Sequence, residues 1–265
     1  MGVIVNSRPM SVTHKPFRHA LALSIIAFAV STYQSGAAPS PSSPNIGASR
    51  SIKTDTLVMR DVTVSRIGHD QDGQETTFVL SYPQIVKPTT EAQRDWNRRR
   101  ANEHKIPKDV EHSDTDWTYS YEMGLVTSKI ISMQQSNFMY GHGTPHGYGG
   151  TTSSNWLLGE TREMRPEDMF SSSAQWPQAL SRICADEIAK LNNKDMTNKM
   201  ADPAQLLPMV IEAHRWFLTD AGLMVQFDTY ELGGHTDGEA QIQISWNRLK
   251  PYLNADFSKL IAQPH

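Results

Sequence analysis

Polar and apolar residues alternate along several segments of this chain, as they do in strands that bury one face. Residues 116–122 place an aromatic side chain at every second position, which is the period of a half-buried strand. Residues 56–67 and 75–82 are rich in β-branched side chains in partly alternating order. The turn-forming residues 70–73 separate these two runs, so we expect a β-hairpin.

The same patterns predict elements along the rest of the chain. Further strands are expected at residues 129–140, 151–158, 216–218, 223–230 and 240–245. Helical spacing of apolar side chains predicts helices at residues 89–101, 175–191, 203–213 and 248–253. Because the helices come in blocks rather than in strict alternation with strands, we predict an α+β fold. Its sheet should be mainly antiparallel, with helices packed on it.

The N-terminal residues have the composition of a targeting segment. Basic side chains precede the apolar run 20–30, and small residues follow it up to Ala37. We therefore predict a signal peptide over residues 1–37 and a periplasmic or secreted protein. The apolar run is about half of the ~20 residues that cross a bilayer, so no stable membrane span is expected after signal removal; an uncleaved signal anchor is the alternative. Residues 38–53 are rich in Pro and Ser, which predicts a flexible linker.

The net charge indicates which partners are expected, and the single cysteine indicates a structural role. Residues 1–37 carry three basic and no acidic side chains, so their removal changes the net charge from −3 to −6. A negative chain is not expected to bind nucleic acid, but it suits a basic protein partner. The single cysteine, Cys184, lies on the apolar stripe of a predicted helix. We expect it to be a buried structural thiol.

Residues 140–150 are the most unusual segment, because they contain five glycines, two histidines and two tyrosines. Glycine permits positive φ and close backbone approach, so we expect a shaped surface loop between two strands. Tyrosine adds contact area and a hydrogen-bonding tip at low entropic cost. A second glycine-bearing loop covers residues 233–238. The candidate binding residues of the two loops are Tyr140, His142, His146, Tyr148, His235 and Asp237.

The sequence offers little support for catalysis. His142 and His146 have the spacing of two zinc ligands on a helix, but the Gly-Thr-Pro between them would break that helix. No nucleophile elbow or nucleotide-binding glycine motif is present. We therefore expect a non-enzymatic protein with no metal and no cofactor. The alternative is a metal-dependent envelope hydrolase in which His235 joins the two other histidines.

A series of short motifs follows an order that is familiar from one family. The motifs are Tyr82-Pro83-Gln84-Ile85, Trp96-Asn97, Ile131-Ser132-Met133, the 140–150 segment, Gly159 with Met169-Phe170, Phe217-Leu218-Thr219 with Gly222-Leu223, Tyr230-Glu231-Leu232, Gly238 and residues 242–249. Together they resemble the extracytoplasmic domain of RsiV-type anti-sigma factors and the accessory, non-catalytic domain of PdaC-type peptidoglycan deacetylases. The resemblance covers about residues 54–253. It implies an α+β extracytoplasmic fold in two halves, which we place at residues 54–140 and 141–265.

For RsiV-type members, the resemblance implies that this domain binds lysozyme as a signal. We recognise no sigma-binding or deacetylase segment in the sequence, so we expect binding alone. The sequence thus predicts an exported, non-enzymatic cell-envelope protein that recognises a protein such as lysozyme, or peptidoglycan. A structural envelope protein with no specific ligand is a further alternative.

Overall fold

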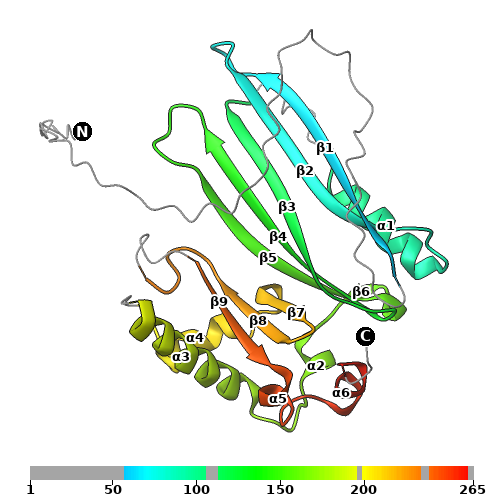
Figure 1. Ribbon diagram of the computed structural model, residues 1–265, viewed down its shortest axis with the longest axis vertical. Coiled ribbons are helices and arrows are strands. Elements are labelled where there is room, and N and C mark those ends of the chain that lie inside the picture. Colours follow the sequence, from blue (N-terminus) through cyan, green and yellow to red (C-terminus); the bar gives the residue numbers. More distant parts are fainter. Residues whose placement is uncertain (1–56, 106–112, 196–198, 234–238, 262–265) are drawn as a thin grey trace, which may run out of the picture. The chain divides into compact units, whose positions relative to one another are not determined.

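The computed structural model describes residues 57–105, 113–195, 199–233 and 239–261 (Figure 1). These residues form a six-stranded sheet in the order β1-β2-β3-β4-β5-β6 and a three-stranded sheet in the order β7-β8-β9. Neighbouring strands are antiparallel, except for β2 and β3. The predicted α+β class with a mainly antiparallel sheet is confirmed. The predicted signal peptide and linker lie outside the described residues.

The six-stranded sheet is formed by the first part of the described chain. Its elements are β1 (Met59–His69), β2 (Glu75–Ile85), α1 (Glu91–Glu103), β3 (Thr115–Val126), β4 (Ile130–Gly141), β5 (Tyr148–Leu157), the 3₁₀ turn η2 (Leu158–Glu160) and β6 (Arg162–Glu163). The parallel pairing of β2 with β3 is confined to Phe78–Leu80, and α1 makes the crossover between these strands. Thr90 and Gln93 form a capping box that begins α1. Trp96 anchors the helix, because it is buried in a cluster that includes Ile85.

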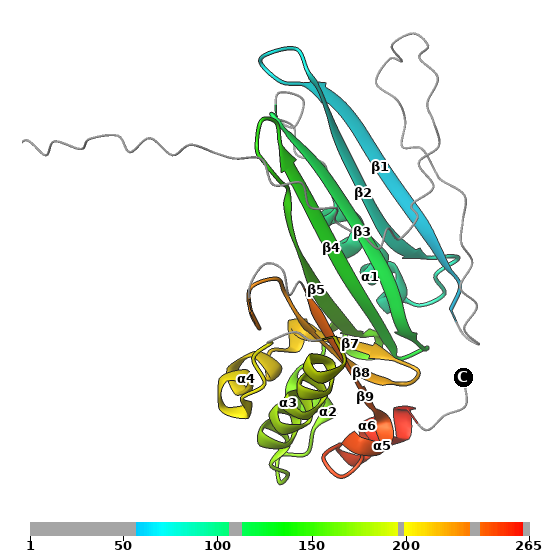
Figure 2. The same ribbon diagram turned by 60° about the vertical axis from the view of Figure 1, so that its left-hand side comes forward.

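The remaining elements build the second sheet and its helices. They are α2 (Pro166–Met169), α3 (Trp176–Asp195), α4 (Pro203–Val210), the 3₁₀ turn η3 (Ala213–Arg215), β7 (Trp216–Thr219), β8 (Gly222–Phe227), β9 (Ala240–Ser245), α5 (Trp246–Leu249) and α6 (Ala255–Ile261). Helices α3 and α4 lie side by side next to this sheet (Figure 2). None of the helices in the described ranges combines the length and the apolar character that a membrane span requires.

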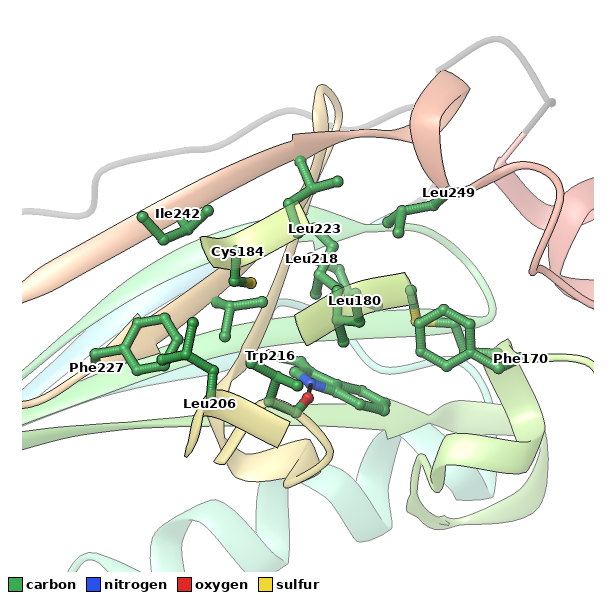
Figure 3. Close-up of a cluster of buried hydrophobic side chains, with 14 of the residues drawn as sticks. Phe170, Leu180, Cys184, Leu206, Trp216, Leu218, Leu223, Phe227, Ile242 and Leu249 are labelled. Atoms are coloured by element: carbon green, nitrogen blue, oxygen red, sulfur yellow. Dashed lines mark hydrogen bonds between the residues drawn. The ribbon is translucent and has the colours of Figure 1, made fainter. Parts of the chain in front are cut away.

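The largest hydrophobic cluster lies between α3, α4 and the three-stranded sheet (Figure 3). Leu218, Leu223 and Ile244 from the sheet are fully buried there, as is Cys184 from α3. Burial raises the pKa of the Cys184 thiol to about 12, so the thiolate is not formed near neutral pH. The prediction of a buried structural cysteine is confirmed.

The two sheets are joined at β7, whose outer edge lies against the six-stranded sheet. The Leu218 N–H donates to the Ser132 hydroxyl at 2.9 Å, and the Asn155 side-chain amide donates to the Trp216 carbonyl oxygen at 2.7 Å. A Cβ on Gly124 would lie 2.1 Å from the carbonyl oxygen of Leu218. Side chains of the six-stranded sheet thus form hydrogen bonds with backbone groups of the edge strand β7. Gly124 allows the two backbones to approach more closely than a residue with a Cβ would.

Three features of the fold differ from the sequence-based picture. The predicted helix at residues 248–253 is replaced by α5 and α6, and Asn254 begins α6 by accepting the Phe257 N–H at 2.7 Å. The glycine-rich segment is shorter than expected, because β4 runs through Gly141 and β5 begins at Tyr148. The boundary placed between residues 140 and 141 lies inside β4, and the division into two halves stays a prediction.

Candidate functional site

The glycine-rich segment forms the tip of the β4–β5 hairpin. Tyr140 belongs to β4 and Tyr148 to β5, so residues 142–147 alone connect the strands. Among the five glycines, only Gly143 has a positive φ, of +80°. Close packing accounts for Gly149, where a Cβ would lie 2.2 Å from a backbone oxygen of β4. The glycines therefore allow tight strand contact more than they provide a loop of many conformations.

His142 links this tip to the neighbouring strands. Its Nδ1 lies 2.7 Å from Oδ2 of Asp70 and its Nε2 lies 3.4 Å from Oδ2 of Asp116. The His142 and Asp70 side chains are only 8% and 7% exposed. The hydrogen bond between them raises the pKa of His142 and lowers the pKa of Asp70. His142 thus holds two hairpins together through a charge-assisted hydrogen bond.

Both carboxylates that face His142 are fixed by backbone groups. Oδ1 of Asp70 accepts the N–H groups of Asp72 at 2.9 Å and Gln74 at 2.8 Å, which closes the β1–β2 turn as the sequence predicts. Oδ1 of Asp116 accepts the Thr77 N–H at 2.7 Å. In each case the second oxygen remains for the imidazole. The tip is therefore preorganised by hydrogen bonds rather than by an apolar core.

The other predicted binding residues are arranged differently. Tyr140 is partly buried, with its ring 6.4 Å from the His142 ring. His146 is exposed, and its Nδ1 lies 3.2 Å from the Gly147 carbonyl oxygen. Tyr148 is 63% exposed. His235 and Asp237 lie outside the described residues, so their convergence with His142 remains a prediction.

A metal site is not apparent in the part of the chain that the structure describes. No three His, Cys, Asp or Glu side chains there form a group that could hold an ion. His142 and His146 point to different partners, a carboxylate and a backbone carbonyl respectively. The spacing of the two histidines therefore reflects a hairpin tip and not one face of a helix.

An acidic depression of about 400 Å³ opens beside His142. Its lining residues are Asp70, Gln71, Asp72, Ser113, Asp114 and His142. Asp72 and Asp114 are exposed, so their charges reach solvent and attract basic groups. The sequence analysis missed this cluster because Asp70 and Asp72 lie in the β1–β2 turn and Asp114 lies just before β3, and these segments meet only in the fold.

A larger hollow of about 590 Å³ lies on the face of the sheet that carries the C-terminal end of α1. Its lining residues are Phe78, Leu80, Glu103, His104, Lys105, Trp117, Tyr119, Gln135, Ser136, Asn137, Gly150, Thr151, Thr152, His214 and Asp228. The rings of Phe78, Trp117 and Tyr119 contact one another, with centroid distances of 6.1 Å from Trp117 to each of the others and 5.8 Å between Phe78 and Tyr119. Three rings thus form an aromatic floor. We call this feature the aromatic hollow.

Amide side chains form a polar wall beside this floor. The His104 Nδ1 donates to the Arg100 carbonyl oxygen at 2.6 Å, and burial lowers the pKa of His104. The neutral ring therefore accepts at Nε2, which contacts the amide nitrogen of Gln135. Gln135 is left with its Oε1 as an acceptor. Asn137 accepts the Gly150 N–H at 2.8 Å through Oδ1, which leaves its Nδ2 as a donor.

The part of the chain that matches a known family includes the three-stranded sheet. Residues 167–247 match the family described as "Protein of unknown function (DUF3298)". This segment is similar to DUF3298 domains. It runs from α2 to α5 and includes β7, β8 and β9. The acidic depression is lined entirely by residues that precede the matched segment, and the aromatic hollow is so except for His214 and Asp228.

Solved structures of DUF3298 proteins share the fold more widely. A member of this family from Bacteroides fragilis has a TM-score of 0.59 at 14% identity, and covers 77% of this chain and 96% of its own. A DUF3298 family protein from Pseudomonas aeruginosa has a TM-score of 0.53 at 13% identity, with 77% and 97% covered. No curated protein matches the sequence. The similarity to these two solved structures establishes the fold. The resemblance to RsiV-type proteins remains a prediction.

Proposed function

We propose that this protein is an exported, non-enzymatic binding protein of the cell envelope that recognises a basic protein such as lysozyme. The observation that carries the proposal is the acidic depression between the hairpin tips. Asp72 and Asp114 are exposed there beside the buried Asp70–His142 pair. Exposed carboxylates attract basic side chains and give a partner its orientation.

The β4–β5 hairpin that carries His142 also has exposed aromatic side chains, one on each of its faces. Tyr148 is 63% exposed and Phe138 is 51% exposed on the same hairpin. Aromatic side chains supply much of the binding free energy in protein interfaces. The hydrogen bonds of His142 hold the two tips in place before a partner arrives, which lowers the entropic cost of association.

The sequence supports the same partner class independently. The net charge of −6 expected after signal removal favours a basic protein over an acidic one. The resemblance to RsiV-type extracytoplasmic domains implies lysozyme as the ligand. The predicted signal peptide would place the protein in the periplasm or outside the cell, where lysozyme acts.

Calorimetry with lysozyme tests the proposal. The double variant Asp72→Asn, Asp114→Asn removes the two exposed charges, and we expect it to bind lysozyme about tenfold more weakly than the unaltered protein, because each rim charge contributes roughly 0.5–1 kcal/mol. Affinity of the unaltered protein should also fall as salt is added.

Asp186→Asn with Asp220→Asn is the matched control, since these exposed carboxylates lie on α3 and in the β7–β8 turn. It changes net charge equally and should bind as the unaltered protein does. Equal weakening in both double variants would show a net-charge effect without a site. If calorimetry detected binding of peptidoglycan fragments but not of lysozyme, the partner would be peptidoglycan and not a protein.

A further inference from the structure

The aromatic hollow has the chemical pattern of a site for a flat ligand with polar edges. Its floor consists of the stacked rings of Phe78, Trp117 and Tyr119. Phe78 is buried, whereas Trp117 and Tyr119 are half-buried and face the hollow. A volume of about 590 Å³ falls within the ~300–1,000 Å³ typical of small-ligand sites.

The register of the strands places the polar wall directly beside the floor. Tyr119 pairs with Asn137 across β3 and β4, and Asn137 pairs with Gly150 across β4 and β5. One row of the sheet therefore passes from an aromatic ring to an amide and then to a residue with no side chain. A Cβ on Gly150 would meet nothing closer than 3.8 Å. A group placed above Gly150 would therefore make ordinary contacts with Asp228 and Asn137 without a clash.

The amide side chains of Gln135 and Asn137 supply one hydrogen-bond acceptor and one donor. The His104 ring occupies the amide nitrogen of Gln135, so Oε1 of Gln135 is the acceptor. The Gly150 N–H occupies Oδ1 of Asn137, so Nδ2 of Asn137 is the donor. An acetamido group presents the complementary N–H and C=O pair.

The charges around the hollow do not favour an ionic ligand. The opposite charges of Glu103 and Lys105 offset one another, and Asp228 is the other carboxylate among the lining residues. Oδ1 of Asp228 already accepts the Thr151 N–H at 3.3 Å. A neutral ligand with an apolar face, hydroxyl edges and an amide substituent fits this arrangement better than a charged one.

We propose that the aromatic hollow binds an oligosaccharide of N-acetylated hexosamines. The apolar C–H face of a pyranose ring lies on Trp117 and Tyr119, and its acetamido group pairs with Gln135 and Asn137. This site is separate from the acidic depression, so binding of the sugar and binding of lysozyme can each fail while the other holds. Chitin and peptidoglycan both contain the proposed sugar chemistry.

The test is calorimetry of the unaltered protein with three ligands of matched length. These are an N-acetylglucosamine trimer, a soluble peptidoglycan fragment with alternating muramic acid, and cellotriose, which lacks acetamido groups. We expect binding of the N-acetylglucosamine trimer and at least about tenfold weaker binding of cellotriose, since the loss of one or two hydrogen bonds costs about a factor of ten. The peptidoglycan fragment decides which natural source fits.

Gly150→Leu places a side chain in the hollow and should reduce affinity by about 100-fold or more while the protein stays folded. Gly159→Leu is the matched control, because Gly159 is exposed, a Cβ there would meet no heavy atom within 4 Å, and the residue lies outside the hollow. Asn137→Asp keeps the acceptor for Gly150 but removes the donor, and should weaken binding about tenfold. Circular dichroism checks the fold of each variant.

Two results would overturn the proposal. The first is the absence of binding of any acetamido sugar by the unaltered protein. The second is unchanged affinity in a folded Gly150→Leu variant, which would place the sugar elsewhere. Equal affinity for cellotriose would remove the acetamido assignment to Gln135 and Asn137.

Discussion

Aromatic side chains are fully packed in the three-stranded sheet but partly exposed in the aromatic hollow of the six-stranded sheet. Trp216 in β7 is 1% exposed, contacts Phe170 and Trp176 edge-on, and donates its indole N–H to the Val210 carbonyl oxygen at 2.8 Å. Trp117 in β3 is half-buried, and its indole N–H has no partner in the described structure. The first ring is packed for stability, and the second is left available for contact.

This difference follows the division between the two sheets. The segment that matches DUF3298 contains most of the large hydrophobic cluster. Residues that precede this segment form the whole acidic depression and most of the aromatic hollow. The family match therefore covers the part that we expect to stabilise the protein. Recognition, as proposed, depends on strands and hairpin tips outside the match.

The largest expected effect separates the two tryptophans. Trp216→Ala should lower the free energy of unfolding by about 3–5 kcal/mol, because it leaves a cavity and an unpaired carbonyl. Trp117→Ala should lower it by roughly 1–2 kcal/mol, since that ring is already partly solvated. Urea unfolding followed by circular dichroism measures both. Similar losses in the two variants would contradict the division into a stabilising and a binding region.

Two glycines give a second comparison with a smaller expected effect. A Cβ on Gly222, at the start of β8, would lie 1.9 Å from the Ile244 carbonyl oxygen, so Gly222→Ala should cost about 2 kcal/mol or more. A Cβ on Gly150 would make only ordinary contacts, 3.8 Å from Asp228 and 3.9 Å from Asn137, so Gly150→Ala should change the free energy of unfolding by about 0.5 kcal/mol or less. Thermal unfolding distinguishes them. A large loss for Gly150→Ala would mean that the hollow is tightly packed.

The smallest effect concerns the hairpin tips and depends on pH. Folding raises the pKa of His142, so its contribution is complete below the ordinary histidine pKa and is lost as pH rises through the raised value. Folding lowers the pKa of Asp70, so that contribution is present above the ordinary aspartate pKa and is lost as pH falls through the lowered value. His142→Asn should therefore destabilise most at about pH 5–6 and least at about pH 9.

Urea unfolding of the unaltered protein and of His142→Asn at both pH values measures this difference. The variant His146→Asn is the control, because His146 is exposed at the same tip and makes no ion pair with Asp70. A difference for His142→Asn that grows toward pH 9 would have the wrong sign for a protonated His142 bound to Asp70.

The sequence predicted the regular elements better than the sites. Alternating aromatic residues identified β3, because a two-residue period depends on local geometry alone. The partner of His142 was missed because Asp70 lies 72 residues away. The floor of the aromatic hollow was also missed, although Trp117 and Tyr119 were placed on one strand face. Their proximity to Phe78 requires the parallel β2–β3 pairing, which no local pattern encodes.

The glycine-rich segment illustrates the same limit. Its composition correctly indicated a connection between two strands, but composition could not show that Gly149 packs against a backbone oxygen of β4. Its histidine spacing suggested paired ligands, whereas His142 turns to Asp70 and His146 to a backbone carbonyl. Which neighbours a side chain meets is decided by strand register, and register is a property of the whole sheet.

Hydrogen exchange of the protein with and without lysozyme tests the central claim most directly, because it locates a contact without altering any residue. We predict slower amide exchange on binding at residues 70–75, 113–116 and 142–148, with unchanged exchange in β7, β8 and β9. Protection confined to the three-stranded sheet, or no protection at saturating lysozyme, would contradict the assignment of recognition to the hairpin tips.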